Sequence, residues 1–357
     1  MFRTRIDRPL LIALLLLGLG GLVLLFSASG GNWQLVFRQG IRLSLGLILL
    51  FALAMTPPRY FRMASPALYL LALLLLVAVL IFGARGKGAE RWINLGLFQF
   101  QPAELMKLAL PLALAWYFHE HPGAPRWDEV LAATLIVALP AALIVVEPDL
   151  GTGILVIGAG AAVLFLSGIK PRYLFGFALL LAATLPLAWH FLHGYQRQRL
   201  LIFLDPQRDP LGAGYHIIQS KIAIGSGALF GQGFLKGSQA QLNFLPERTT
   251  DFIFSVFAEQ FGLIGSLALL ALYAFIIGRG FILAARAHTR YGRLAAAGIV
   301  STFTLYVVVN VGMVIGVVPV VGVPLPLVSY GGTSIVTVLA GFGILMGIAA
   351  HRRLIDA

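Results

Sequence analysis

The sequence predicts an all-α, polytopic integral membrane protein, with about ten transmembrane helices, one long extracytoplasmic loop and both termini in the cytoplasm. Composition is the first reason: 59% of residues are hydrophobic and 11% are charged, whereas soluble domains have about 25% charged residues. Secondly, apolar runs long enough to cross a bilayer recur along the chain. No soluble domain, low-complexity tract or clear repeat interrupts them, so residues 1–357 are treated as one membrane domain.

The first span is expected at 9–26, after three arginines in the first eight residues. A signal peptide has the same charge order, but its apolar core is usually about 7–15 residues, so we interpret this run as a retained span. Pro102 stands in the first turn of its span, where its missing N–H costs nothing. Pro140 and Pro186 fall inside spans and predict kinks. Six further spans are expected at 35–55, 66–82, 102–118, 130–146, 150–167 and 172–190.

Residues 191–250 form a long mixed segment with no span of its own. Within it, the apolar run 214–225 is interrupted by Gln219, Ser220 and Lys221, and is too short and too polar to cross a membrane. This pattern is typical of an interfacial helix. The remaining spans are expected at 251–278, 295–315 and 331–350.

Lysine and arginine are biased toward the segments that would be cytoplasmic if the N-terminus is inside, which predicts this orientation for both termini. The two principal outer loops, 83–101 and 191–250, still carry many basic residues. This excess indicates an anionic ligand on the outer face. The alternative, that long loops cross regardless of charge, accounts for the second loop but not for the first.

Two charged residues interrupt the span at 102–118. Glu104 and Lys107 are three residues apart, so they share one helix face and can pair. Glu104 also stands in the first turn, where the helix dipole favours an anion. The pair is either structural or lines a substrate groove, because charges inside a membrane usually face a cavity.

The stretch from Leu245 to Ser255 brings charge to the start of the eighth expected span. Asp251 is either an ordinary helix N-cap or a functional acid, since charge in lipid costs about 2.5–3.5 kcal/mol at mid-depth. Asp251, Ser255 and Glu259 recur every four residues and predict one polar stripe. Arg38 and Arg42, also four apart, are explained by snorkelling to lipid headgroups.

Two outer segments have chemistry suited to phosphate. One is glycine-rich and opens the last span with Ser329, Gly331, Gly332 and Ser334; its N–H groups and the helix N-terminus would favour an anion, although plain helix capping is an equal alternative. The other contains Glu147 and Asp149, which could hold a divalent cation through oxygen ligands or cap the next helix. The sequence leaves both alternatives open.

Several blocks, in order over nearly the whole chain, resemble the SEDS family (shape, elongation, division and sporulation). Gly214–Ile217 and Gly237–Gln239 are more similar to its rod-shape-determining members than to its division or sporulation members. Thr249, where histidine is expected, and Ala103, where serine is usual, depart from the family pattern without removing an acid. The shared blocks are Arg91–Ile93, Gln101–Lys107, Pro148–Thr152, Gly214–Tyr215 with Gln219–Ser220, Phe244–Glu247, Asp251–Phe254 and Pro326–Gly332.

The resemblance implies a peptidoglycan glycosyltransferase that polymerises lipid II on the outer face of the cytoplasmic membrane. Asp251 matches the family's essential aspartate, which would act as general base in an inverting transfer. A divalent cation, Mg²⁺ or Mn²⁺, could assist the diphosphate, and no tightly bound cofactor is expected. The implied substrate contacts include Glu104 and the diphosphate candidates Lys107, Arg199, Lys221 and Arg248, with Gln219, Ser220 and Glu247.

The implied partner is a class B penicillin-binding protein, a transpeptidase, alongside lipid II and the membrane; no nucleic acid is expected. Two other classes of function remain open. A lipid II flippase would use the same basic groove and needs no base. A non-catalytic scaffold for a transpeptidase would need only lipid-facing surfaces, and the polar stripe argues against it.

Overall fold

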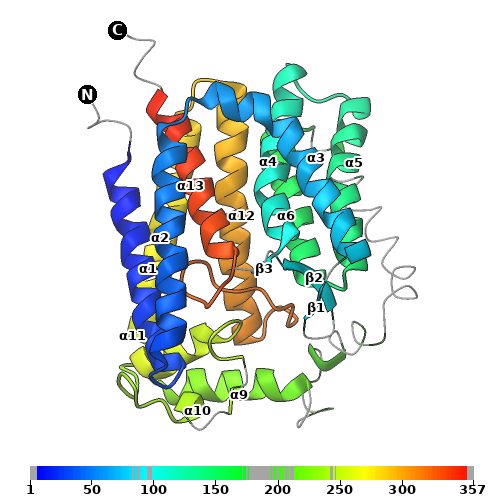
Figure 1. Cartoon of the computed structure of the whole chain (residues 1–357). Helices are drawn as coiled ribbons and strands as arrows, with labels where there is room; N and C mark the ends of the chain where they lie inside the picture. Colours follow the sequence, from blue (N-terminus) through cyan, green and yellow to red (C-terminus); the bar gives the residue numbers. More distant parts are fainter. Residues whose placement is uncertain are drawn as a thin grey trace.

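The structure is a computed structural model of the whole chain, a bundle of long helices with additional short elements at one end (Figure 1). Both termini lie at the opposite end of the bundle from these short elements. The residues that the structure describes are 6–82, 84–86, 89–94, 99–170, 172–173, 176, 194, 197, 201–203, 205, 209, 213–241, 244–245 and 247–351.

The elements alternate long helices with short connections, as expected of a polytopic protein. Before the long loop they are α1 (Arg8–Ala28), α2 (Trp33–Met55), α3 (Pro58–Phe82), β1 (Ala84–Gly86), β2 (Ala89–Asn94), β3 (Gln99–Phe100), α4 (Pro102–Glu120), α5 (Trp127–Val146) and α6 (Leu150–Leu166). After it begins they are α9 (Ala213–Ser226), α10 (Ser238–Gln241), α11 (Ile253–Ala285), α12 (Arg290–Ile315) and α13 (Ser334–Ala350).

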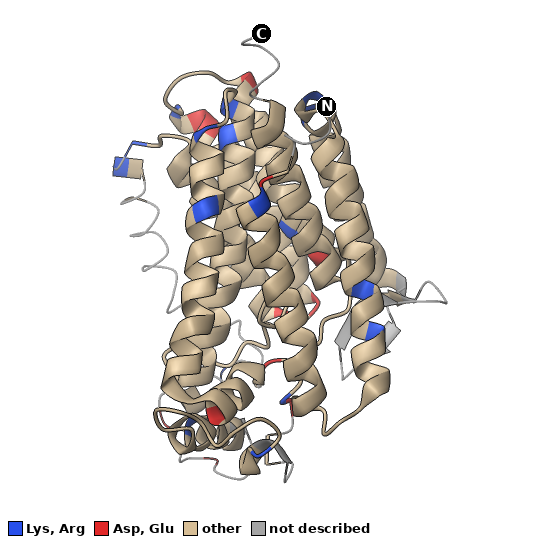
Figure 2. Cartoon of the chain, turned by 90° about the vertical axis from the view of Figure 1, so that its left-hand side faces the viewer, with Lys and Arg blue, Asp and Glu red and all other residues tan. Residues whose placement is uncertain are grey.

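Among the described residues, six helices are long and apolar enough to cross a membrane by length and composition, namely α1, α2, α3, α5, α11 and α12. Helices α6 and α13 are apolar but shorter, and α4 carries the charged pair. Charged residues lie near both ends of the bundle and also at several positions along the helices between them (Figure 2). The all-α, multi-pass membrane class is therefore confirmed.

Every expected span that falls within the described residues overlaps a helix; most of the span expected at 172–190, with its Pro186, lies outside them. Two helices begin five residues or more before the expected position, for local reasons. Helix α3 begins at Pro58, earlier than 66, because proline is tolerated in a first turn. Helix α12 begins at Arg290, earlier than 295, because Thr289 caps it: the Gly292 N–H donates to the Thr289 hydroxyl at 3.0 Å.

A break in α11 at Gly262 was not predicted from the sequence. Gly262 has φ 65° and ψ −163°, a conformation that is essentially restricted to glycine. The glycine loop, which we define as residues 227–233, replaces the helical hydrogen bonds lost there. The N–H groups of Leu263 and Ile264 donate to carbonyls of this loop at 2.9 and 3.2 Å. In return, the carbonyls of Glu259 and Gln260 accept from it at 2.9 and 3.0 Å.

The loop at 83–101, which is expected on the outer face, contains a three-stranded antiparallel sheet in the order β1-β2-β3. The sequence analysis treated this segment only as a charged loop. The sheet lies at the same end of the bundle as α9 and α10 (Figure 1). It places Trp92 beside the loop that precedes α13, because a Cβ added at Gly332 would lie 3.5 Å from the Trp92 ring.

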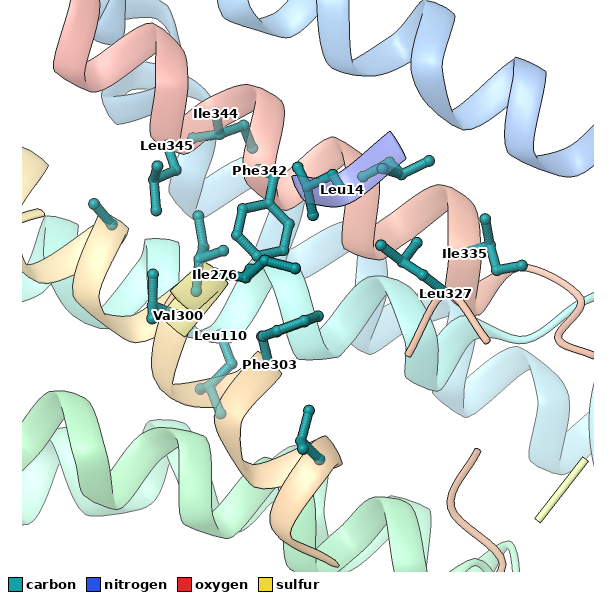
Figure 3. Packing of buried hydrophobic residues seen from close by; sticks show 14 of the residues in the cluster. Leu14, Leu110, Ile276, Val300, Phe303, Leu327, Ile335, Phe342, Ile344 and Leu345 are labelled. Carbon is teal, nitrogen blue, oxygen red and sulfur yellow. The ribbon is translucent and has the colours of Figure 1, made fainter. Parts of the chain in front are cut away.

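The hydrophobic core runs through the middle of the bundle, between α1, α4, α11, α12 and α13 (Figure 3). The Phe303 and Phe342 rings meet edge to face, with centroids 5.0 Å apart. Leu327 belongs to this core although it lies in the loop before α13. The proline-rich loop, which we define as residues 317–327 between α12 and α13, is thereby anchored among the helices. This loop supports the candidate site.

Candidate functional site

Asp251 lies in a turn that precedes α11, not at the helix N-cap. The helix begins at Ile253, and Phe252 occupies the N-cap position without a side-chain cap. The turn is closed by the Glu247 carbonyl, which accepts from the N–H groups of Thr250 and Phe252 at 3.2 Å each. The Thr250 hydroxyl also donates to the Glu247 carboxylate at 2.9 Å. The N-cap interpretation of Asp251 was therefore wrong, and its side chain is partly exposed.

Three consecutive carbonyls of this turn are held by groups from other parts of the chain. The Tyr330 N–H donates to the Thr249 carbonyl at 2.8 Å, and the Ser329 hydroxyl donates to that of Thr250 at 2.6 Å. The Asn310 amide donates to the carbonyl of Asp251 at 2.9 Å. The backbone that carries Asp251 is thus fixed against α12 and the loop before α13, which removes much of the freedom a turn otherwise has.

Gly322 approaches the Asp251 carboxylate from the proline-rich loop. A Cβ added at Gly322 would lie 3.4 Å from Asp251 Oδ2. Gly322 has φ +74°, a left-handed conformation that favours glycine. The loop therefore comes close to the carboxylate without a side chain between them.

Ser329 does not suit its expected role as a substrate contact. It is 1% exposed, and its hydroxyl both donates to Thr250 and accepts from the Leu325 N–H at 2.7 Å. Its carbonyl accepts from the buried Gln39 amide at 2.8 Å. With its groups so engaged, Ser329 positions the loop rather than a ligand.

The start of α13 keeps the remaining glycine-rich residues together. Gly331 and Ser334 pack directly against each other, and Gly332 faces Trp92. Arg42 contacts the protein: its guanidinium donates to the Gly331 carbonyl at 3.3 Å and stacks 4.8 Å from the centroid of the Tyr330 ring. The snorkelling interpretation considered α2 alone, without the loop that packs on it, and it stays a prediction.

Glu104 and Lys107 form the predicted ion pair, 2.8 Å apart, with side chains 6% and 5% exposed. Tyr306 of α12 completes a closed set: the Lys107 ammonium donates to the Tyr306 hydroxyl, which donates to Glu104 at 3.0 Å. Thr337 of α13 donates to the same Glu104 oxygen at 3.4 Å. Charges this deeply buried require such partners.

This cluster lines a small pocket of about 30 Å³ between α4, α12 and α13. Its remaining walls are largely apolar and include Leu108, Phe303 and Phe342. A pocket of this size holds about one water molecule, so the contacts of Glu104 and Lys107 seen in this structure are structural. Their role at a substrate groove stays a prediction.

Of the predicted polar stripe, Ser255 and Glu259 lie on α11 and are buried, whereas Asp251 lies in the turn before the helix and is partly exposed. The Ser255 hydroxyl lies 2.7 Å from that of Ser220, which also donates to the Val314 carbonyl at 2.7 Å. Glu259 is fully buried and accepts from the Gln239 N–H at 2.8 Å. Ser220 and Glu259 therefore join α9 and the 237–239 segment to α11 and α12, and the substrate contact expected of Ser220 has no exposed group to make it.

The segment expected as an interfacial helix is α9, which packs on α11 and α12. Gln219 is partly exposed and Lys221 is exposed, with the Lys221 side chain over Gly316 at the end of α12. Glu247 and Arg248 are in the Asp251 turn itself, and burial lowers the pKa of Arg248. Arginine has so high an ordinary pKa that it stays cationic. Arg199 lies outside the described residues.

The acidic pair at 147 and 149 fits a helix cap. Asp149 accepts from the Thr152 N–H at 3.2 Å at the start of α6, and its other oxygen accepts from the Gln101 amide at 3.0 Å. Glu147 is buried at the end of α5. Within the described part of the chain, no group of three or more His, Cys, Asp or Glu side chains gathers as metal ligands would.

Three residues of the site were missed by the sequence analysis: Gln39, Tyr306 and Asn310. Each is a polar side chain within a long apolar span, which is the signal that could have found them. Their partners are 199 to 292 positions away along the chain for Gln39 and Tyr306, so sequence spacing could not show what they bind.

The helices and the site define a multi-pass membrane protein whose polar groups converge at two places, a buried ion pair and an acidic turn at the end of the bundle. The chain belongs to the cell cycle protein family of FtsW, RodA and SpoVE, whose family model matches residues 7–354. The resemblance to the SEDS family is thereby confirmed.

Individual relatives agree over nearly the full length. Peptidoglycan glycosyltransferase MrdB of Escherichia coli K12 is 48% identical over 99% of this chain and 96% of its own. A chain of a solved peptidoglycan synthase complex is 36% identical, with a TM-score of 0.85 over 98% of this chain and 99% of that one. The crystal structure of the rod shape determining protein RodA of Thermus thermophilus is 32% identical, with a TM-score of 0.74 over 98% of each chain.

Proposed function

We infer that the protein is a peptidoglycan glycosyltransferase of the rod-shape type, which polymerises lipid II into glycan strands with Asp251 as the general base. The observation that carries this is the placement of Asp251: a partly exposed carboxylate on a turn whose backbone is held at three consecutive carbonyls. The full-length relation to proteins named peptidoglycan glycosyltransferases supports the reaction class.

In the proposed reaction, the Asp251 carboxylate takes the proton of an acceptor sugar hydroxyl. The hydroxyl oxygen forms a bond to the anomeric carbon of the donor sugar, on the face opposite its diphosphate. The bond from that carbon to the diphosphate oxygen breaks, and the polyprenyl diphosphate leaves with the electron pair. Attack from the opposite face inverts the anomeric centre.

Cations would stabilise the leaving diphosphate, because charge that develops in the transition state is best met by fixed opposite charge. Arg248 is nearest to Asp251 in the chain, and Lys221 is exposed on the neighbouring α9. Lys107 would contact the lipid-linked substrate at the predicted substrate groove. Among the described residues, no cluster of three or more His, Cys, Asp or Glu side chains could hold a metal ion by itself. The proposed reaction includes no step that requires a metal ion. Addition and chelation of Mg²⁺ or Mn²⁺ would test whether a divalent cation assists the diphosphate.

The solved structural relative is part of a peptidoglycan synthase complex, so a partner in peptidoglycan synthesis is expected for this chain too. We propose a class B penicillin-binding protein as that partner, with the protein in the cytoplasmic membrane and Asp251 on its outer face.

The test is synthesis of glycan strands from lipid II by the purified protein in detergent, alone and with the partner. Detergent micelles have no second leaflet, so a polymerase works there and translocation has no meaning. A partner that lacks its transpeptidase nucleophile should still activate. If no strands form under any of these conditions while the protein moves lipid II across liposome bilayers, the flippase alternative replaces the proposal. Loss of both activities would favour the scaffold.

Asp251→Asn tests the base itself, because it keeps the size of the side chain and removes its basicity. Strand synthesis should fall to background, whereas folding and abundance should not change. Asp128→Asn is a matched control: Asp128 is an exposed acid at the cytoplasmic end of α5 under the proposed orientation, and this variant should keep full activity. Near wild-type synthesis by the Asp251 variant would refute the base assignment.

A further inference from the structure

Asn310 is a buried amide on α12 that joins the Asp251 turn to the proline-rich loop. Its side chain is fully buried. The Nδ2 group donates to the Asp251 carbonyl at 2.9 Å and to the Val323 carbonyl at 2.7 Å. One side chain thus uses both of its N–H donors on two segments that flank the carboxylate of Asp251.

The two acceptors fix the orientation of the amide. Both are carbonyl oxygens, so the reverse orientation would place Asn310 Oδ1 against two other acceptors. Oδ1 therefore points away, and among the described residues it is buried without a hydrogen-bond partner. An unsatisfied buried acceptor costs stability. An apolar residue would avoid this cost, so packing alone does not explain an amide here, and sites that break a local rule in this way are typically functional.

The neighbouring restraints show what the amide adds. The carbonyls of Thr249 and Thr250 are held by Tyr330 and Ser329, both in the loop before α13. Asn310 holds the next carbonyl, that of the acid itself, and it does so from a membrane-spanning helix. The same side chain holds Val323, next to Gly322, which approaches the Asp251 carboxylate.

We propose that Asn310 is a positioning residue for the glycosyl transfer, which holds the Asp251 carboxylate in its reactive place by clamping the backbone on both sides of it. The inference rests on the proposed role of Asp251 as base. A displacement of about 1 Å of a reacting group can lower a rate about 100-fold. Loss of the clamp should therefore act on the chemical step more than on substrate binding.

The test compares three variants of the full-length protein in detergent, with lipid II as substrate. Asn310→Asp keeps the volume but replaces the Nδ2 group, which carries both N–H donors, by one oxygen that faces the two carbonyls. Asn310→Leu removes the polarity. Thr304→Val is the control on the same helix, because it removes a partly buried hydroxyl that bonds only the Val300 carbonyl, away from the site. The first two should lose about 100-fold in kcat while KM stays near its wild-type value, and the control should keep both.

Hydrogen exchange gives a second measurement that does not depend on activity. In the two Asn310 variants, amide exchange should become faster in residues 247–253 and 319–325, with little change in the other helices. Unchanged kcat in a variant with this local change would overturn the positioning role and leave the role of Asp251 intact. Full activity of Asp251→Asn would instead refute the base, whatever the exchange shows.

Three other outcomes would also overturn the proposal. The first is an equal loss of kcat in Thr304→Val, since any polar deletion on α12 would then have the same effect. The second is a rise in KM with kcat unchanged in both Asn310 variants, since Asn310 would then serve binding. The third is global unfolding of both variants, which would make Asn310 a structural residue. If only Asn310→Leu fails to fold, the kcat of Asn310→Asp decides.

Discussion

Tyr306 and Asn310 lie one turn apart on α12, and each binds a different half of the site. Tyr306 bonds the Glu104–Lys107 pair, and Asn310 bonds the carbonyl of Asp251. Four residues span about 6 Å along a helix and return to nearly the same face. One rigid helix therefore sets the spacing between the buried ion pair and the proposed base.

The ion pair gives the first prediction. Lys107→Ala leaves Glu104 buried without its cation, and breaking a buried pair in this way costs about 3–5 kcal/mol. Activity should fall sharply in this variant and also in Glu104→Gln. The charge-swapped double variant should recover folding but not full activity, because the cation moves by nearly one helical turn. Thermal unfolding in detergent and strand synthesis measure the two effects separately.

Tyr306→Phe refines this prediction, because it removes only the hydroxyl that bridges the pair. Hydrogen bonds to charged groups contribute about 1.5–3 kcal/mol, so stability should fall by an amount of that order. For the ion pair itself, full activity in the charge-swapped double variant of Glu104 and Lys107 would show that this pair is only structural.

The break in α11 gives the second prediction. A Cβ at Gly262 would lie 2.4 Å from the Gly231 nitrogen and 2.6 Å from the Leu229 carbonyl oxygen. Gly262→Ala should therefore lower thermal stability, by at least the roughly 1–3 kcal/mol that a strained backbone costs. Gly278→Ala is the matched control on the same helix, where an added Cβ meets nothing within 4 Å. It should be neutral or slightly stabilising, because alanine favours a helix. Equal effects of the two changes would contradict the role assigned to the break.

The long apolar spans could be predicted from the sequence because each signal is local: about 20 apolar residues must cross a bilayer as a helix. The Glu104–Lys107 pair could be predicted for the same reason, since both partners are on one turn of one helix. The break at Gly262 could not, because it depends on the glycine loop about 30 residues earlier supplying its hydrogen bonds.

The candidate site could likewise be predicted only in its local features, and not in its contacts between distant parts of the chain. Asp251 was found through the family resemblance and through charge at the start of a span. The turn that carries it depends on Asn310, Ser329 and Tyr330, which meet it only in three dimensions. Ser329 was assigned to substrate because its neighbours in the chain suit phosphate, and Ser220 because the family resemblance implied it. In the structure, both hydroxyls instead form buried hydrogen bonds within the protein, which no local sequence pattern could reveal.

The ion pair between Asp7 and Arg279 gives the third prediction, a dependence of stability on pH. Burial alone would raise the pKa of Asp7, but hydrogen bonds from Arg279 and from the Leu10 N–H, with the charge of Arg279, lower it below 3.8 overall. A carboxyl whose pKa is lower in the folded state stabilises the fold above its unfolded pKa, and this contribution is lost as pH falls through the folded value.

Thermal unfolding between pH 6 and pH 3 would measure this effect. Asp7→Asn should be less stable than the wild type at pH 6, and the difference should narrow as the solution is acidified below about pH 3.8. Asp128→Asn is the control, because Asp128 makes only an exposed pair with Arg126, and exposed pairs contribute about 0–1 kcal/mol. A constant difference between wild type and Asp7→Asn across this range would contradict the assignment.

The last prediction concerns sidedness, on which the proposed outer site depends. The chain has no cysteine, so a single introduced cysteine reports one position without background. Ser238 is exposed beside α10, and Asp128 is exposed near the start of α5, at the opposite end of the bundle (Figure 1). If the termini are cytoplasmic, Ser238→Cys should react with a membrane-impermeant thiol reagent in intact cells, and Asp128→Cys should react only after the membrane is opened. Both variants should first be shown to support strand synthesis, so that labelling reports the native fold. Labelling in the opposite sense would place Asp251 on the cytoplasmic side, where it could not act on a substrate presented at the outer face.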